Sequence, residues 1–130
     1  MAGWTYRCYG SKDPNDWQRW FDTLTKRDQA KHDSVFDILE QRPQAEWRSP
    51  YAKKLKGGSP DLWEILVQTN IAYRVFGYFS GSQEFTVTGL GHHKGNTYKP
   101  ANIMETSRDR RKAIEIGSLE TTPCARPQTP

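Results

Sequence analysis

The side chains best suited to chemistry gather in one β-rich stretch, residues 62–100. Arg74 lies in the middle of this stretch, and His92 and His93 lie near its end, a few residues before Tyr98. A guanidinium group matches the geometry of a phosphate, and histidine exchanges protons near neutral pH without a shifted pKa. The stretch therefore contains the residue types needed to bind a phosphate and to move a proton beside it.

Each of these residues also has a plain structural interpretation. Arg74 could be an exposed sheet residue paired with Glu64 or Glu84, because surface ion pairs are common and weak. The two histidines could be ordinary surface residues, and the tyrosine could pack at the entry of a following helix. Since adjacent residues of a strand point to opposite faces, we expect only one of the two histidines to face a shared site.

Three predicted strands would position these side chains. Alternation of apolar and polar residues predicts strands over residues 62–69, 71–79 and 84–90, with turn signals between them. Connections this short cannot cross over to make parallel pairs, so the three segments are expected to form an antiparallel meander. A further strand is predicted over residues 4–9, where it could pair with an edge of the meander.

Three helices complete the predicted fold. Asp13 can cap a first helix with Pro14 in its first turn, and Thr25 can cap a second helix that ends before Pro43. These two helices form a hairpin with an aromatic inner face. A third helix with a basic middle is predicted over residues 101–117, with Asn102 available as its cap. The predicted class is α+β, with an N-terminal strand and a helical hairpin packed on the meander and a helix at the C-terminal end.

Length and composition indicate one small domain. A chain of 130 residues suits a single domain, which we expect over residues 1–117. Residues 118–130 include three prolines and show no periodicity, which predicts a disordered tail. No apolar run approaches the roughly 20 residues of a membrane helix, and no signal-peptide pattern opens the chain. We therefore expect a soluble cytoplasmic protein.

Net charge and cysteine content say little about the function. The chain has 19 Lys and Arg against 15 Asp and Glu, and a net charge of +4 attracts polyanions non-specifically. Cys8 and Cys124 provide neither a disulfide framework nor metal-ligand spacing, so both are expected to be free thiols. No metal or other cofactor is expected.

The order of these elements, together with several short motifs, resembles the RelE/ParE superfamily of toxins from bacterial toxin–antitoxin pairs, and within it the HigB-like and phage-derived branch. The motifs are YAKKLKG at 51–57, LWEI at 62–65, YRVF at 73–76, GHHK at 91–94 and YKP at 98–100. The resemblance covers residues 4–117. It implies a compact RelE-like fold and a metal-independent ribonuclease that cuts mRNA in the ribosomal A site. It also implies a cognate antitoxin protein, expected to carry a helix-turn-helix domain.

The implied reaction uses the ribose 2′-hydroxyl as nucleophile on the adjacent phosphorus. It needs a base, a cation for the phosphoryl oxygens and an acid for the leaving 5′-oxygen. Arg74 matches the arginine of the family's YRV motif, and His92 or His93 would transfer protons. Tyr98 stands where many RelE-type toxins have a functional tyrosine, and it would stack on a base or orient the 2′-hydroxyl.

Lysines and one glutamate complete the implied site. Where RelE carries two strand lysines, this chain has Glu64 and Leu66, so a lysine-based mechanism does not carry over. Glu64 would serve either as the general base or as the residue that orients Arg74, since a carboxylate beside an arginine is a weak base. Four lysines are expected to contact RNA or the ribosome: Lys94 and Lys99 on one rim, and Lys54 and Lys56 on the other. A solvated lysine run is the alternative.

Two other functions stay open at this point. ParE-type members of the superfamily poison DNA gyrase and cleave no RNA. A non-catalytic phage or plasmid regulator could bind RNA or protein through the same basic face. The combination of Arg74 with His92, His93 and Tyr98 favours the ribonuclease.

Overall fold

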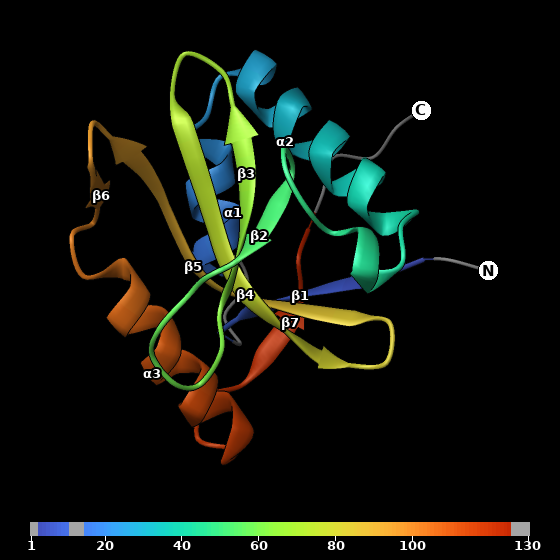
Figure 1. The fold of residues 1–130 in the computed structure, drawn as a ribbon, viewed down its shortest axis with the longest axis vertical. Helices are drawn as coiled ribbons and strands as arrows, with labels where there is room; N and C mark the ends of the chain where they lie inside the picture. The colour runs from blue at the N-terminus through green and yellow to red at the C-terminus, as the bar shows by residue number, and fades with distance from the viewer. Residues whose placement is uncertain (1–2, 11–14, 126–130) are drawn as a thin grey trace.

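The computed structural model describes residues 3–10 and 15–125. These residues form a seven-stranded sheet with three α-helices (Figure 1). In chain order the elements are β1 (Thr5–Tyr9), α1 (Asp16–Asp22), α2 (Lys26–Glu40), the 3₁₀ turn η1 (Gln44–Glu46), β2 (Ala52–Lys54), β3 (Trp63–Gln68), β4 (Ala72–Gly81), β5 (Glu84–Lys94), β6 (Thr97–Lys99), α3 (Ile103–Glu115) and β7 (Thr121–Pro123). The predicted α+β class is confirmed.

The predicted meander is the centre of the sheet. β3, β4 and β5 pair antiparallel in sequence order, as their short connections require. β2 extends the sheet beside β3, and β6 folds back on the end of β5. β1 pairs with β5 in parallel, which the intervening helices allow, and β7 pairs antiparallel with β1. The predicted first strand therefore does pair with the edge of the meander, while β2, β6 and β7 are short strands that the sequence pattern did not indicate.

The helical hairpin forms as predicted. Asp13 and Pro14 lie outside the described residues, and Asn15 is the N-cap of α1, its Oδ1 accepting a hydrogen bond from the Gln18 amide at 2.9 Å. Thr25 caps α2 as predicted, because its hydroxyl accepts from the Asp28 amide at 3.1 Å. The hairpin covers one face of the sheet and buries its aromatic side there.

The main core lies between this hairpin and the sheet. Its fully buried side chains come from both layers: Trp17, Val35, Phe36 and Leu39 from the helices, and Ile65, Val67, Val75 and Phe85 from the strands. Trp47, just after η1, closes one end of this core, with its ring 4.9 Å from that of Phe79. Removal of this apolar surface from water is the main contribution to the stability of the fold.

α3 packs on the opposite face of the sheet. Asn102 occupies its N-cap position, but its side chain makes no capping hydrogen bond. A side chain at Gly89 of β5 would collide with Ser107 and Ile103, so the glycine permits close approach of helix and sheet. None of the helices in the described ranges is long and apolar enough to cross a membrane.

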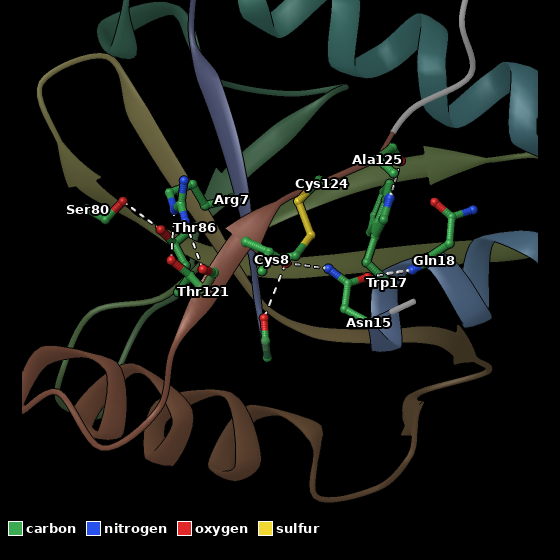
Figure 2. The surroundings of a disulfide bond; sticks show 12 residues. Arg7, Cys8, Asn15, Trp17, Gln18, Ser80, Thr86, Thr121, Cys124 and Ala125 are labelled. Carbon is green, nitrogen blue, oxygen red and sulfur yellow. Dashed lines mark hydrogen bonds between the residues drawn. A yellow bond between two sulfur atoms is a disulfide. The ribbon is translucent and has the colours of Figure 1, made fainter. Parts of the chain in front are cut away.

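The prediction of a disordered tail is wrong for residues 118–125. Residues 121–123 form β7, and Cys124 forms a disulfide with Cys8, so the prediction of two free thiols is also wrong (Figure 2). The two cysteines are 116 positions apart in the sequence, and the fold alone brings them together. The folded part of the chain therefore extends past the predicted boundary at residue 117, and residues 126–130 lie outside the described ranges.

Candidate functional site

Arg74 and Glu64 meet on the sheet face that also carries α3. The register pairs Leu66 with Arg74 and Glu64 with Phe76, which makes Arg74 and Glu64 diagonal neighbours on one face. Arg74 Nε lies 3.8 Å from Glu64 Oε2, and Arg74 Nη1 donates to the Tyr73 carbonyl at 2.9 Å. The side chains are 15% and 1% exposed, so this contact is not a solvated surface pair.

Glu64 is the centre of a group of polar side chains that we call the Glu64 cluster: Glu64, Arg74, Lys53, Tyr98 and His93. Besides Arg74, the carboxylate has Lys53 Nζ at 3.4 Å and accepts a hydrogen bond from the Tyr98 hydroxyl at 3.2 Å. An unpaired buried carboxylate would be strongly unfavourable, and these partners compensate its charge. With 1% exposure, Glu64 can hold Arg74 and Tyr98 in place but is too enclosed to reach a substrate itself.

His93 joins the cluster through Tyr98. β6 pairs with β5 so that His93 is opposite Tyr98, and the two ring centroids lie 4.8 Å apart. On β4, His93 is opposite Ala72, two positions from Arg74 and therefore on the same face. His92 is opposite Tyr73 and so lies on the other face. The two histidines are separated by the sheet, as strand alternation predicts, and His93 is the one on the Arg74 face.

The environment of Tyr98 limits what its hydroxyl can do. Burial raises the pKa of Tyr98, and the charge of Glu64 and the hydrogen bond to it raise the pKa further, against an opposing effect of Arg74. The phenol therefore stays protonated at neutral pH and acts as a hydrogen-bond donor. Its ring also packs against Phe76 at a centroid distance of 5.4 Å, which fixes its orientation.

β2 contributes a lysine that sequence reasoning did not select. Lys53 is opposite Glu64 in the β2–β3 register, whereas Lys54 is opposite Trp63 and therefore points to the other face. Lys54 forms an exposed ion pair with Asp61 at 3.3 Å. Strand alternation against Glu64 would have identified Lys53, but a strand of three residues is too short to show a period.

The other predicted RNA-binding lysines do not gather around Glu64. Lys94 is opposite Thr97, and Lys99 is opposite His92, which places both on the His92 face. Lys56 is exposed and lies in the loop after β2. The structure therefore brings together Glu64, Arg74, His93 and Tyr98, and it places His92, Lys54, Lys94 and Lys99 on the other face.

The arginine side chains in the middle of α3 donate hydrogen bonds to backbone carbonyls of other elements. Arg108 donates to the Gly57 carbonyl at 2.6 Å, and Arg111 donates to the Asp61 carbonyl at 2.6 Å. Arg110 donates to the Thr88 carbonyl at 2.9 Å and lies over the ring of Tyr9. These arginines fasten α3 to the β2–β3 loop and to β5, so they are structural groups rather than a free basic surface.

Residues 19–112 match the family described as Phage derived protein Gp49-like (DUF891). The chain belongs to this family of RelE-like toxins. The matched segment contains the whole Glu64 cluster, while β1 and β7 lie outside it. No curated protein and no solved structure shows significant similarity to the chain. The resemblance to the RelE superfamily is thus supported at the level of the family, and membership of the HigB-like branch stays a prediction.

Proposed function

We propose that the chain is the toxin of a toxin–antitoxin pair and that it cleaves mRNA on the ribosome through the ribose 2′-hydroxyl. The observation that carries the proposal is the Glu64 cluster, which places a fixed guanidinium, an imidazole and a phenol on one face of the sheet. Membership of a family of RelE-like toxins supports the same function. Action on ribosomes would take place in the cytoplasm.

Arg74 would bind the phosphoryl oxygens. The ion pair of Nε with Glu64 and the hydrogen bond of Nη1 to the Tyr73 carbonyl hold the guanidinium, which leaves further N–H groups for a phosphate. Donors that are held in place before the reaction stabilise developing charge better than mobile ones. Lys53, with a side chain 55% exposed, would add a second positive charge at the same face.

His93 would carry out one of the two proton transfers. In one half of the reaction a base removes the 2′-hydroxyl proton as the oxygen attacks phosphorus, and in the other an acid protonates the 5′-oxygen as the P–O bond breaks. His93 is partly exposed and lies against Tyr98, whose ring would stack on a base or direct the ribose. Glu64 would be a positioning residue for Arg74 and Tyr98 rather than the general base.

Expression in a bacterial host tests the function. Growth and translation should stop on induction, and mapping of RNA ends should show mRNA cut only when ribosomes are present. Intact mRNA together with trapped gyrase–DNA complexes would contradict the proposal and favour a ParE-like toxin. Co-expression of a helix-turn-helix protein encoded next to the gene should restore growth, as expected of a cognate antitoxin.

The two adjacent histidines supply a matched pair of variants. His93→Ala should lower the cleavage rate by about 10²–10⁴-fold, the usual contribution of an acid–base group. His92→Ala should cleave at close to the wild-type rate, because its side chain lies on the other face. Circular dichroism and thermal melting would show that both variants fold. Equal activity of the two variants, high or low, would contradict the assignment.

A further inference from the structure

The last described segment of the chain, residues 120–125, lies against the first strand. β7 pairs antiparallel with β1, and backbone hydrogen bonds continue the pairing at both ends. Gly10 donates to the Glu120 carbonyl at 2.8 Å, and Cys124 donates to the Tyr6 carbonyl at 3.0 Å. A three-residue strand at the edge of a sheet is weakly held by such bonds alone. Side-chain hydrogen bonds from Arg7 to Thr121 and a covalent link add to these backbone bonds.

The Cys8–Cys124 disulfide is the covalent link between this segment and β1, as Figure 2 shows. It joins residues 116 positions apart, and closing so long a loop restricts the unfolded chain more than closing a short one. Cys8 is completely buried, whereas Cys124 is 9% exposed. A reductant would therefore reach the bond from the side of Cys124.

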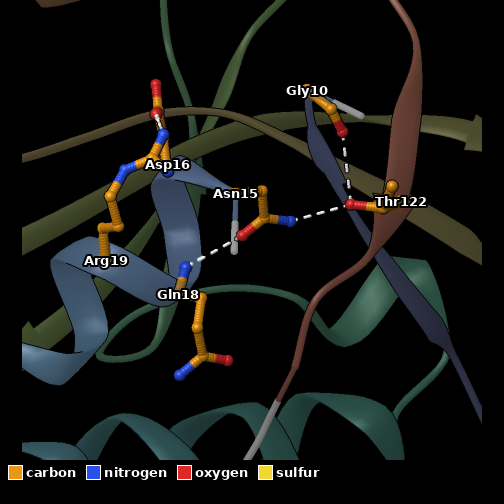
Figure 3. Close-up of polar contacts among 6 residues, drawn as sticks. All are labelled: Gly10, Asn15, Asp16, Gln18, Arg19 and Thr122. Atoms are coloured by element: carbon orange, nitrogen blue, oxygen red, sulfur yellow. Dashed lines mark hydrogen bonds and ion pairs between the residues drawn. The ribbon is translucent and has the colours of Figure 1, made fainter. Parts of the chain in front are cut away.

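The same segment supports the start of α1 (Figure 3). Asn15, which caps α1 through Oδ1, donates from Nδ2 to the Thr122 hydroxyl at 2.8 Å. Trp17, only 1% exposed, donates from Nε1 to the Ala125 carbonyl at 2.6 Å. The first turn of α1 is thus tied to residues 120–125 by two side chains. Loss of this segment would remove both ties.

Disulfides are rare in reducing compartments, where those that form are usually transient or redox-sensing. We infer that the Cys8–Cys124 bond is a redox-controlled clasp. In the oxidised protein it holds residues 120–125 on β1 and on the start of α1, and in the reduced protein this segment detaches. The inference goes beyond RNA cleavage, and only the reducing compartment rests on the proposed function, because β1 and β7 lie outside the segment that matches the toxin family.

A thiol reductant opens the clasp, and with a dithiol the exchange has two steps. A thiolate of the reductant attacks Cys124 Sγ, the S–S bond breaks, and Cys8 leaves as a thiolate that takes up a proton. The second thiol of the reductant then displaces Cys124 as a thiol, and the reductant becomes a disulfide. Two electrons and two protons reach the protein in total. A disulfide oxidant such as oxidised glutathione closes the clasp by the reverse exchange.

Hydrogen–deuterium exchange of the full chain, oxidised by glutathione disulfide or reduced by dithiothreitol, tests the clasp. Reduction should speed exchange much more in peptides that cover residues 120–125 and the first turn of α1 than in β3, β4 and β5, where exchange should rise only by the loss of global stability. The apparent melting temperature should fall by about 10 °C, as expected for loss of a disulfide in a domain of this size. None of these measurements depends on nuclease activity.

Two variants separate the disulfide from the hydrogen bonds around it. Cys124→Ser should behave like the reduced protein under oxidising conditions and should not respond to dithiothreitol. Thr122→Val keeps both cysteines but removes the hydroxyl that accepts from Asn15. It should speed exchange in the first turn of α1 and leave the disulfide intact.

Three results would overturn the inference. The disulfide would not be a clasp if it failed to form with oxidised glutathione, or if excess dithiothreitol could not reduce it in the folded protein. Unchanged exchange of residues 120–125 after reduction would show that the bond does not hold this segment. An equal rise in exchange over the whole sheet, with no excess in residues 120–125 or the first turn of α1, would show a global support instead of a local one.

Discussion

The two faces of the central sheet carry the same three kinds of side chain in the same contact. On each face a tyrosine donates its hydroxyl to a carboxylate while a histidine ring packs against the tyrosine. The two sets are Glu64, Tyr98 and His93 in the Glu64 cluster, and Asp28, Tyr73 and His32 in what we call the Asp28 cluster. The hydroxyl–carboxylate distances are 3.2 and 2.6 Å, and the His–Tyr ring distances are 4.8 and 4.7 Å.

What separates the clusters is positive charge and exposure. Arg74 and Lys53 lie beside the Glu64 carboxylate, whereas no lysine or arginine in the described ranges forms an ion pair with Asp28. His93 is partly exposed, but His32 is 1% exposed and its Nε2 has no hydrogen-bond partner among the described residues. The same groups therefore form a sealed core network on one face and a candidate site on the other.

Tyr73 connects the two faces. Its hydroxyl belongs to the Asp28 cluster, while its carbonyl accepts from Arg74 Nη1. Trp20 of α1 packs edge-on against the Tyr73 ring at a centroid distance of 5.9 Å. The core network thus fixes the backbone that orients the guanidinium of the candidate site. Rigidity on one face is a precondition for chemistry on the other.

Of the variants that distinguish the two faces, Arg74→Lys should have the largest effect, a loss of mRNA cleavage with little loss of stability. The substitution keeps the charge beside Glu64 but loses the planar fork that matches a phosphate. We expect mRNA cleavage to fall by about 10²–10³-fold, comparable with loss of one preorganised donor, while the melting temperature changes little. Single-turnover cleavage on ribosomes measures the effect. Wild-type cleavage in this variant would show that the arginine serves the sheet and not the substrate.

Removal of each tyrosine hydroxyl compares how much the two clusters contribute to the free energy of unfolding. Tyr73→Phe leaves the buried Asp28 carboxylate without its short hydrogen bond, and we expect the free energy of unfolding to fall by about 1–3 kcal/mol. Tyr98→Phe should lower it by less than about 1 kcal/mol, because Glu64 keeps two cationic partners. Urea denaturation of both variants gives the two values. The reverse order would mean that the Glu64 cluster is the structural one.

Local sequence patterns were sufficient for the central part of the fold. The alternation in residues 62–90 predicted the meander, and Thr25 was identified as the cap of α2 because both signals depend on neighbouring residues. β7 and the Cys8–Cys124 pairing were missed because three residues show no period and because the partners lie at opposite ends of the chain. Contacts of this kind depend on tertiary packing that no local window contains.

Strand alternation alone predicted part of the candidate site, namely which residues of one strand share a face. Alternation separated His92 from His93 in principle, and the register then placed His93 on the Arg74 face. The same rule could not select Lys53 over Lys54 without knowledge that β2 exists. The Asp28 cluster gave no signal either, because a histidine in an amphipathic helix has the same pattern whether it packs in the core or faces water.

The dependence of the free energy of unfolding on pH tests whether the Asp28 cluster is closed to solvent. Burial lowers the pKa of His32, against smaller opposing effects of its hydrogen bond to the Asp28 carbonyl and of the Asp28 charge. Since that carbonyl only accepts, His32 Nδ1 carries a proton, and the lowered pKa favours the neutral ring. The folded protein thus binds fewer protons than the unfolded chain once the pH falls below about 6.5, the ordinary pKa of histidine.

Stability should therefore be full above about pH 6.5 and decline as the pH falls through the lowered pKa of His32, by at most about 1.4 kcal/mol per pH unit. Tyr73, with its pKa raised to about 12 by burial and by the bond to Asp28, does not titrate in this range. Urea denaturation between about pH 5 and 7.5 avoids most carboxylate titration. His32→Phe should flatten the decline. A decline that survives in His32→Phe would mean that the histidine on the sealed face is not the group that responds to acid.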